Sequence, residues 1–178
     1  MPDAAIARLN AVPQEEAERL LLECCGSTNW ARRMAAQRPF QDRSELLDAA
    51  GRIWRELGRE DWLEAFSGHP KIGQKAAARR GSEQARRWSE QEQAGTAGAR
   101  EDVRAALAEA NHAYEARFGY IFIVCATGKT TEEMLALLQN RLQNDPSSEL
   151  RIAAEEQRKI TRLRLEKLLR ESEARIGR

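Results

Sequence analysis

The spacing of apolar residues along the chain predicts several amphipathic helices. In residues 14–25 and 44–57, large apolar residues recur every three or four positions, which is the period of one helix face. The same spacing predicts a helix in residues 103–118. It also predicts a long helix that begins at Asp145-Pro146, because proline fits the first turn of a helix. These segments favour an all-α protein.

Two shorter helices are expected in the first half of the chain. Ser27 is a suitable N-terminal cap, and a helix that follows it must end before Pro39, since proline cannot continue a helix. Trp62 and Phe66 lie on one short apolar face before the sequence GHPKIG. No repeat or linker divides the chain, so we expect one multi-helix bundle in a single domain, residues 1–178.

Two segments depart from the helical pattern. Residues 118–130, FGYIFIVCATGKT, are aromatic and β-branched, as in a buried strand. A single strand without a partner forms no sheet, so we expect a short buried helix or an extended connection, and no significant β-sheet. Residues 75–99 contain few large apolar side chains. We expect them to be exposed and partly mobile, and a candidate lid.

Charge and composition exclude several classes of function. The chain has 29 Lys and Arg residues against 28 Asp and Glu residues, so no global positive field attracts nucleic acid. No run of 18 apolar residues indicates a membrane span, and no apolar N-terminal run indicates a signal peptide. Cys24, Cys25 and Cys125 form no metal-binding pair. We therefore expect reduced thiols, a cytoplasmic location and no bound metal.

A possible nucleotide-binding motif is excluded by its spacing. Gly128-Lys129-Thr130 matches the end of a P-loop, but the first glycine of that motif would stand where the chain has Ile123. The alternative is a helix that begins near Thr130, which can act as its N-terminal cap.

The chain has only two histidines, and one of them lies in an unusual place. His112 falls inside a predicted helix, where an exposed or core side chain is expected. His69 precedes a proline, which favours an extended backbone, and a glycine follows four residues later. This fixes the imidazole on a non-helical corner, where catalytic groups are often found. A histidine that only bonds backbone groups at a helix junction is the alternative.

A second group of polar residues shares one helix face. Ser89, Glu92 and Gln93 stand at positions i, i+3 and i+4, so a helix would present a hydroxyl, a carboxylate and an amide together. A solvated helix face is the alternative. In the final helix, Arg162 or Arg164 can point inward, beside apolar neighbours.

These features occur within blocks that cover nearly the whole chain. In order, the blocks are Leu9-Asn10, CCGSTNWARRM, RPF, IW, DWLEAFSGHPKIG, WSEQEQAG, FGYIFIVCATGKT, RLQNDPSSEL and KITRLRLEKLL. With them the chain resembles the family of 2-oxo-4-hydroxy-4-carboxy-5-ureidoimidazoline decarboxylases, which produce (S)-allantoin from a product of urate oxidation. The resemblance implies a carboxy-lyase with an all-α fold, without metal or organic cofactor, usually a homodimer.

The resemblance also implies the site residues. His69 corresponds to the catalytic proton donor, with Pro70 beside the ligand, and Glu92 assists catalysis. The implied substrate-binding groups are the side chains of Ser89, Gln93 and Arg164 and the backbone of Ile121, Phe122, Ile123, Val124 and Cys125. A non-catalytic helical interaction module is the alternative function.

Overall fold

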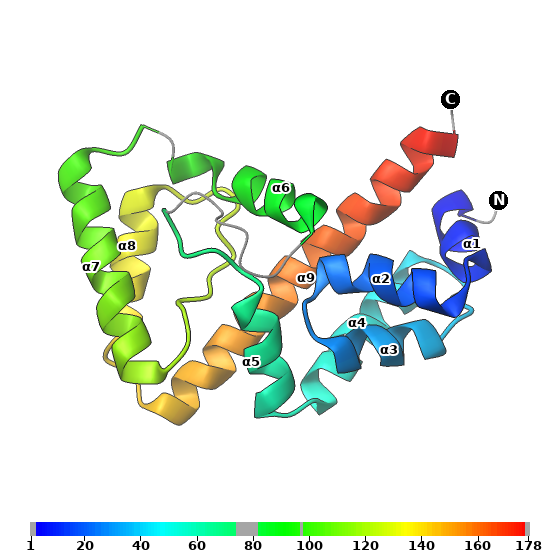
Figure 1. Cartoon of the computed structure of the whole chain (residues 1–178), viewed down its shortest axis with the longest axis horizontal. Helices are drawn as coiled ribbons and strands as arrows, with labels where there is room; N and C mark the ends of the chain where they lie inside the picture. Colours follow the sequence, from blue (N-terminus) through cyan, green and yellow to red (C-terminus); the bar gives the residue numbers. More distant parts are fainter. Residues whose placement is uncertain (1–2, 74–81, 97, 177–178) are drawn as a thin grey trace. The chain divides into compact units, whose positions relative to one another are not determined.

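The computed structural model describes residues 3–73, 82–96 and 98–176, and all regular elements in these ranges are helical. This confirms the predicted all-α class. The helices are α1 (Ala4–Ala11), α2 (Gln14–Cys24), α3 (Thr28–Ala36), α4 (Arg43–Glu56), α5 (Arg59–Ser67), α6 (Glu83–Glu92), the short 3₁₀ helix η1 (Ala94–Thr96), α7 (Glu101–Phe118), α8 (Thr131–Arg141) and α9 (Pro146–Ile176) (Figure 1).

Backbone contacts divide the chain into two compact units. Unit 1 consists of Met1–Ala65 and Arg158–Arg178, and unit 2 consists of Phe66–Gln157. Helices α5 and α9 contribute residues to both units. The expectation of a single domain stays a prediction.

Unit 1 is a set of helices packed through their apolar faces. Helix α3 packs against both α2 and α4. Its residue Trp30 is fully buried, and the indole Nε1 donates a 3.1 Å hydrogen bond to the carbonyl oxygen of Ala50. Ser27 caps α3, as predicted, by accepting a hydrogen bond from the backbone of Trp30. Other large side chains of this core include Leu21, Met34, Leu46 and Ile53.

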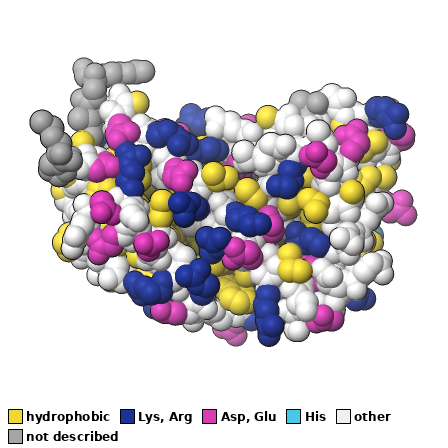
Figure 2. Space-filling model, turned by 180° about the vertical axis from the view of Figure 1, so that it is seen from behind, with side chains coloured by type: hydrophobic (Ala, Val, Ile, Leu, Met, Phe, Trp, Pro, Cys, Tyr) yellow, Lys and Arg dark blue, Asp and Glu magenta, His cyan; other side chains and the backbone are white. Residues whose placement is uncertain are grey.

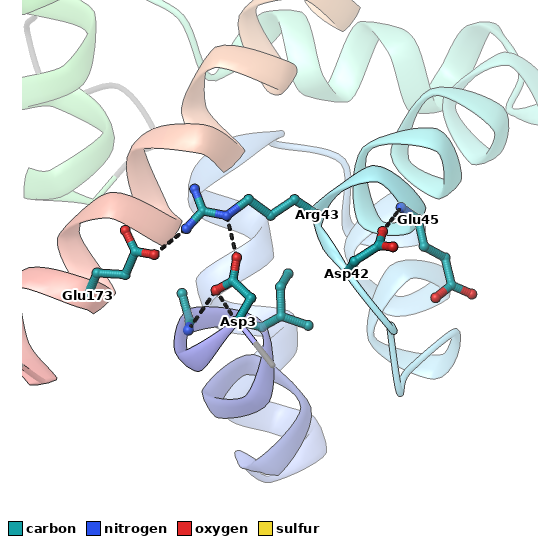
Figure 3. A network of polar contacts seen from close by, with 7 residues as sticks. Asp3, Asp42, Arg43, Glu45 and Glu173 are labelled. Carbon is teal, nitrogen blue, oxygen red and sulfur yellow. Dashed lines mark hydrogen bonds and ion pairs between the residues drawn. The ribbon is translucent and has the colours of Figure 1, made fainter. Parts of the chain in front are cut away.

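A polar network joins three helices of unit 1 (Figure 3). Asp3 caps α1 by accepting hydrogen bonds from the backbone of Ala5 and Ile6, and its other carboxylate oxygen accepts one from Arg43 at the start of α4. Arg43 also pairs with Glu173 of α9. The hydrogen bond from Arg43 lowers the pKa of Asp3. The network therefore fixes α1, a helix that the sequence pattern did not predict.

Unit 2 contains α6, α7, α8 and the first turns of α9. Helices α7 and α8 pack side by side (Figure 1). Tyr114 of α7 lies at the centre of an aromatic cluster, with ring centroids 4.7 Å from Phe118 and 5.3 Å from Phe122. Thr130 caps α8 as predicted, and a reciprocal hydrogen bond from its backbone to Glu133 completes a capping box.

The two segments with irregular patterns gave different outcomes. Residues 119–130, here called the connector, form an extended connection without strand pairing to any described residue, which confirms one of the two alternatives. The expectation that residues 75–99 are exposed is wrong for one face of α6, because Trp88 is only 1% exposed, whereas Arg86, Arg87 and Glu90 are exposed. One large apolar side chain thus anchors one face of a helix that is otherwise polar. Residues 74–81 and 97 lie outside the described residues, so the lid stays a prediction.

Surface charge is mixed, as the composition predicts. On the face drawn in Figure 2, Lys and Arg side chains are interspersed with Asp and Glu side chains.

In the described part of the chain, no helix has both the length and the apolar character that crossing a membrane requires.

Candidate functional site

His69 lies two residues after the end of α5, and its backbone N–H still bonds to the carbonyl oxygen of Phe66 at 3.1 Å. The ring is partly buried. Its Nε2 atom lies 2.6 Å from Oε1 of Gln157, a residue of α9 whose side chain is fully buried. The other histidine, His112, is exposed on α7. The two histidines therefore differ in environment as the sequence predicted.

The residues that follow His69 are held by three side chains of unit 2. Asn111 donates a 3.1 Å hydrogen bond to the carbonyl oxygen of Ile72, and Gln93 accepts one from the backbone N–H of Gly73, also at 3.1 Å. Gly73 has a φ of +83°, a conformation that side chains other than glycine disfavour. Lys71 pairs with Glu115 at 2.6 Å. Gln93 thus links the end of α6 to the GHPKIG segment.

Helix α6 buries the polar face that the sequence predicted. Ser89 and Glu92 are 4% and 9% exposed, whereas Glu90 and Gln91 are exposed. The hydroxyl of Ser89 donates a 3.0 Å hydrogen bond to the carbonyl oxygen of Ala85. The alternative of a solvated helix face is therefore wrong for this pair of residues.

Close packing brings the end of α6 to the connector. In η1, which follows Gln93, a Cβ atom added to Gly95 would lie 2.2 Å from the carbonyl oxygen of Lys129. Only a glycine allows this approach without a shift of the backbone. The blocks WSEQEQAG and FGYIFIVCATGKT, which are 23 positions or more apart in the printed sequence, therefore meet at Gly95.

Side chains form hydrogen bonds with the backbone of the connector, in place of the bonds that a neighbouring strand would form in a sheet. Arg141 donates a 2.7 Å hydrogen bond to the carbonyl oxygen of Ile123. Glu156 accepts a 2.8 Å bond from the N–H of Cys125, and Lys129 donates a 2.7 Å bond to the carbonyl oxygen of the same cysteine. Among the described residues, no hydrogen bond involves the backbone groups of Phe122 or Val124.

A buried ion pair supports the connector. Nε of Arg141 lies 2.7 Å from Oε1 of Glu149, whose side chain is fully buried. The same oxygen accepts a 2.5 Å hydrogen bond from Tyr114, and Asn144 donates to Oε2 at 2.9 Å. Burial raises the pKa of Tyr114 most, and the hydrogen bond to Glu149 raises it further. The guanidinium also lies over the ring of Phe122, 4.4 Å from its centroid.

Arg164 belongs to unit 1. Its side chain is 5% exposed, whereas Arg162 is exposed and pairs with Glu166 at 3.5 Å, so Arg164 is the inward arginine of the predicted pair. In unit 1 its positive charge acts on the thiols of Cys24 and Cys25. Burial outweighs this effect and raises the pKa of Cys25 to about 12, so the thiol stays protonated, as expected of an inert core cysteine.

Three polar residues of unit 2 escaped the sequence analysis. They are Arg141, Glu149 and Gln157, all of which lie in predicted helices and are buried. Glu149, Ala153 and Gln157 stand four positions apart on α9 and are each 0% exposed. A polar residue on such a buried stripe was the signal that could have revealed Glu149 and Gln157.

The described residues define an all-helical protein in which a partly buried histidine bonds to a buried amide, α6 carries a buried carboxylate, and an extended connector supplies irregular backbone. The family model for OHCU decarboxylase, where OHCU is 2-oxo-4-hydroxy-4-carboxy-5-ureidoimidazoline, matches residues 10–166. The chain belongs to the OHCU decarboxylase family.

Individual relatives agree with this assignment. The chain is 41% identical over 145 residues to the uric acid degradation bifunctional protein TTL of Arabidopsis thaliana, which covers 82% of the chain and 45% of that protein. It is 33% identical to the OHCU decarboxylase of Amia calva, over 74% of the chain and 75% of the relative. The chain spans less than half the length of the two bifunctional relatives from Arabidopsis thaliana and Bacillus sp..

Solved structures share the fold. A crystal structure of OHCU decarboxylase in the presence of (S)-allantoin superposes with a TM-score of 0.74 at 38% identity, over 89% of this chain and 99% of that one. A crystal structure of (S)-allantoin synthase, at 21% identity and a TM-score of 0.67, shares the fold.

Proposed function

We propose that this chain is a carboxy-lyase that decarboxylates OHCU to (S)-allantoin in urate degradation. Family membership and the similar crystal structure of OHCU decarboxylase in the presence of (S)-allantoin support this activity. The observation that carries the proposal is the buried polar face of α6. Ser89 and Glu92 are removed from solvent beside a core tryptophan, at a desolvation cost that helix formation alone does not require.

The proposed reaction needs a proton donor but no cofactor. In OHCU the carboxylate is attached to a carbon next to a ring imine, so the electrons released with CO₂ can move into that imine. The reaction is then completed by one proton delivered to one face of the ring. Histidine titrates near neutral pH and suits this step. We assign the step to His69, which is partly buried and held by a hydrogen bond.

The other proposed site residues have complementary roles. Glu92 holds the substrate hydroxyl or orients the imidazole, and Pro70 lies beside the ligand. Ser89 and Gln93 bind the amide edges of the substrate. Gln93 is suited to this role because its amide oxygen already accepts from Gly73, so its orientation is fixed.

The connector supplies backbone groups for the ureido and ring amides. Among Ile121, Phe122, Ile123, Val124 and Cys125, the carbonyl of Ile123 and both backbone groups of Cys125 are bonded to side chains. Ile121, Phe122 and Val124 therefore have the backbone groups best suited to bind a ligand. Arg164, with its fork of donors, is proposed to bind an anionic or carbonyl oxygen of the substrate.

The product of the reaction tests the activity. OHCU prepared freshly from urate decays spontaneously to racemic allantoin. We expect the purified chain to accelerate this decay and to yield (S)-allantoin alone, measured by circular dichroism of the product. A racemic product at the spontaneous rate would contradict the proposal. A non-catalytic helical module would give that result, whereas an enzyme should also gain thermal stability from a bound product-like ligand.

We further propose that the protein acts in the cytoplasm as a homodimer. Its three cysteines are all free and buried, which suits a reducing compartment. The family resemblance supports the dimer. Light scattering after size-exclusion chromatography should give twice the chain mass of 20.1 kDa; the mass of one chain would contradict the dimer.

A further inference from the structure

The contact between His69 and Gln157 constrains where the imidazole carries its proton. The 2.6 Å separation between His69 Nε2 and Gln157 Oε1 is short even for an N–H···O bond, and an amide oxygen can only accept. The imidazole must therefore donate from Nε2. The neutral ring then has its lone pair on Nδ1, and the proton gained on acidification goes to that atom.

Gln157 is held firmly enough to impose this constraint. Its side chain is 0% exposed, on the buried stripe of α9 that it shares with Glu149 and Ala153. A buried amide costs free energy unless it is hydrogen-bonded, so exchange of this partner for water is unfavourable. An apolar residue would suffice there if packing were the only requirement.

Two charged residues close to the pair in sequence each have a partner of their own. Lys71 pairs with Glu115 at 2.6 Å, and Glu156 accepts from the backbone of Cys125 at 2.8 Å. Nε2 of His69 itself bonds to the neutral amide of Gln157.

We propose that Gln157 is a positioning residue that keeps Nε2 of His69 protonated and aims Nδ1 as the atom that exchanges a proton with the substrate. The role of Nδ1 rests on the proposed function, whereas the protonation of Nε2 does not. In this proposal, two residues on one buried stripe of α9 position parts of the site. Glu149 fixes the connector through Arg141, and Gln157 fixes the imidazole.

The protonation can be observed directly because the chain has only two histidines. In the full chain labelled with ¹⁵N-histidine, we expect the neutral His69 to show a protonated Nε2, an unprotonated Nδ1 and an Nε2–H signal protected from exchange with water. His112 is exposed and serves as the internal reference. A proton on Nδ1 of neutral His69 would overturn the proposal, whatever the activity of the chain.

Two variants separate positioning from packing. Gln157→Leu should abolish the protected Nε2–H signal and lower kcat about 10- to 100-fold, since a displaced catalytic group loses rate steeply. Gln157→Glu keeps an acceptor of similar shape, so it should retain the signal and raise the titration midpoint of His69 by about 1 pH unit or more through its negative charge. The His112 signals should be unchanged in both variants.

Each possible result supports or overturns a stated part of the proposal. If Gln157→Leu leaves the His69 signals and kcat unchanged, Gln157 has no positioning role. If Gln157→Leu does not fold, the titration of Gln157→Glu decides alone, and an unchanged midpoint overturns the proposal. If the wild type shows the expected His69 signals but does not act on OHCU, the protonation of Nε2 stands, while the role of Nδ1 falls with the proposed function.

Discussion

The two units differ in how each satisfies its backbone. In unit 1, helices pack through apolar faces, and polar side chains such as Asp3 and Ser27 act mainly at helix ends. In unit 2, the connector has no helix or sheet to bond it, and three ionic side chains bond to Ile123 and Cys125 instead. A buried backbone group left without a partner is costly. Charged side chains, of which Arg141 is buried, therefore support the irregular backbone of the connector.

The largest effect should come from breaking that support. Arg141→Met removes the donor to Ile123 and leaves the carboxylate of Glu149 buried without its cation. Loss of one partner of a buried ion pair costs about 3–5 kcal/mol. We expect a decrease of that size in the free energy of unfolding, measured with urea.

Two controls sharpen this prediction. Arg162→Met removes an exposed i,i+4 pair with Glu166 and should cost about 0.5 kcal/mol or less. The double variant Arg141→Met/Glu149→Leu removes both charges and should be more stable than Arg141→Met alone. Equal costs for Arg141→Met and Arg162→Met would show that the buried pair does not support unit 2.

Substitutions at two glycines should change the free energy of unfolding by intermediate amounts and in opposite directions. Gly95→Ala places a Cβ atom 2.2 Å from the carbonyl oxygen of Lys129, so the free energy of unfolding should fall by about 1–3 kcal/mol. Gly51 lies inside α4 of unit 1, where an added Cβ would meet its nearest neighbour, Arg55, at 3.7 Å. Gly51→Ala should raise the free energy of unfolding by about 0.5–1 kcal/mol. A loss at Gly51 or none at Gly95 would contradict the packing described.

The smallest effect is expected at the edge of unit 1, and it depends on pH. The pKa of Asp3 is lowered in the folded chain by its bond to Arg43, so this pair stabilises the folded state above about pH 4, and the stabilisation is lost as pH falls through the folded-state pKa. Asp3→Asn keeps a capping side chain but removes the charge. We expect it to cost about 0.2–1 kcal/mol at pH 7.

The pH series has a clear control. The difference between wild type and Asp3→Asn should shrink towards zero in unfolding measurements made at successively lower pH, because Asp3 becomes neutral in both states. A difference that stays constant down to the lowest pH would mean that the charge of Asp3 contributes nothing to stability.

The sequence predicted the apolar part of the fold well. Helices expected at residues 14–25, 44–57 and 103–118 occur at Gln14–Cys24, Arg43–Glu56 and Glu101–Phe118. Period and capping residues determine these elements locally. Helix α6 was partly missed, because a single tryptophan anchors it and the rest of its sequence is polar. The burial of one face of α6 results from tertiary packing, which the spacing of apolar residues does not report.

Prediction of the candidate site was less complete. The spacing of Ser89 and Glu92 predicted a shared face, and the scarcity of histidine singled out His69. Arg141 and Gln157 were not predicted, because polar residues in helices are usually exposed, and only the folded chain places them beside Ile123 and His69.

In the proposed mechanism, His69 donates the proton that completes decarboxylation. Steady-state kinetics on fresh OHCU should compare His69→Asn with His112→Asn, since the second variant changes an exposed histidine of the same chain. We expect His69→Asn to lower kcat about 10²- to 10⁴-fold while the protein stays folded, and His112→Asn to match the wild type. A folded His69→Asn variant with the kcat of the wild type would contradict the mechanism.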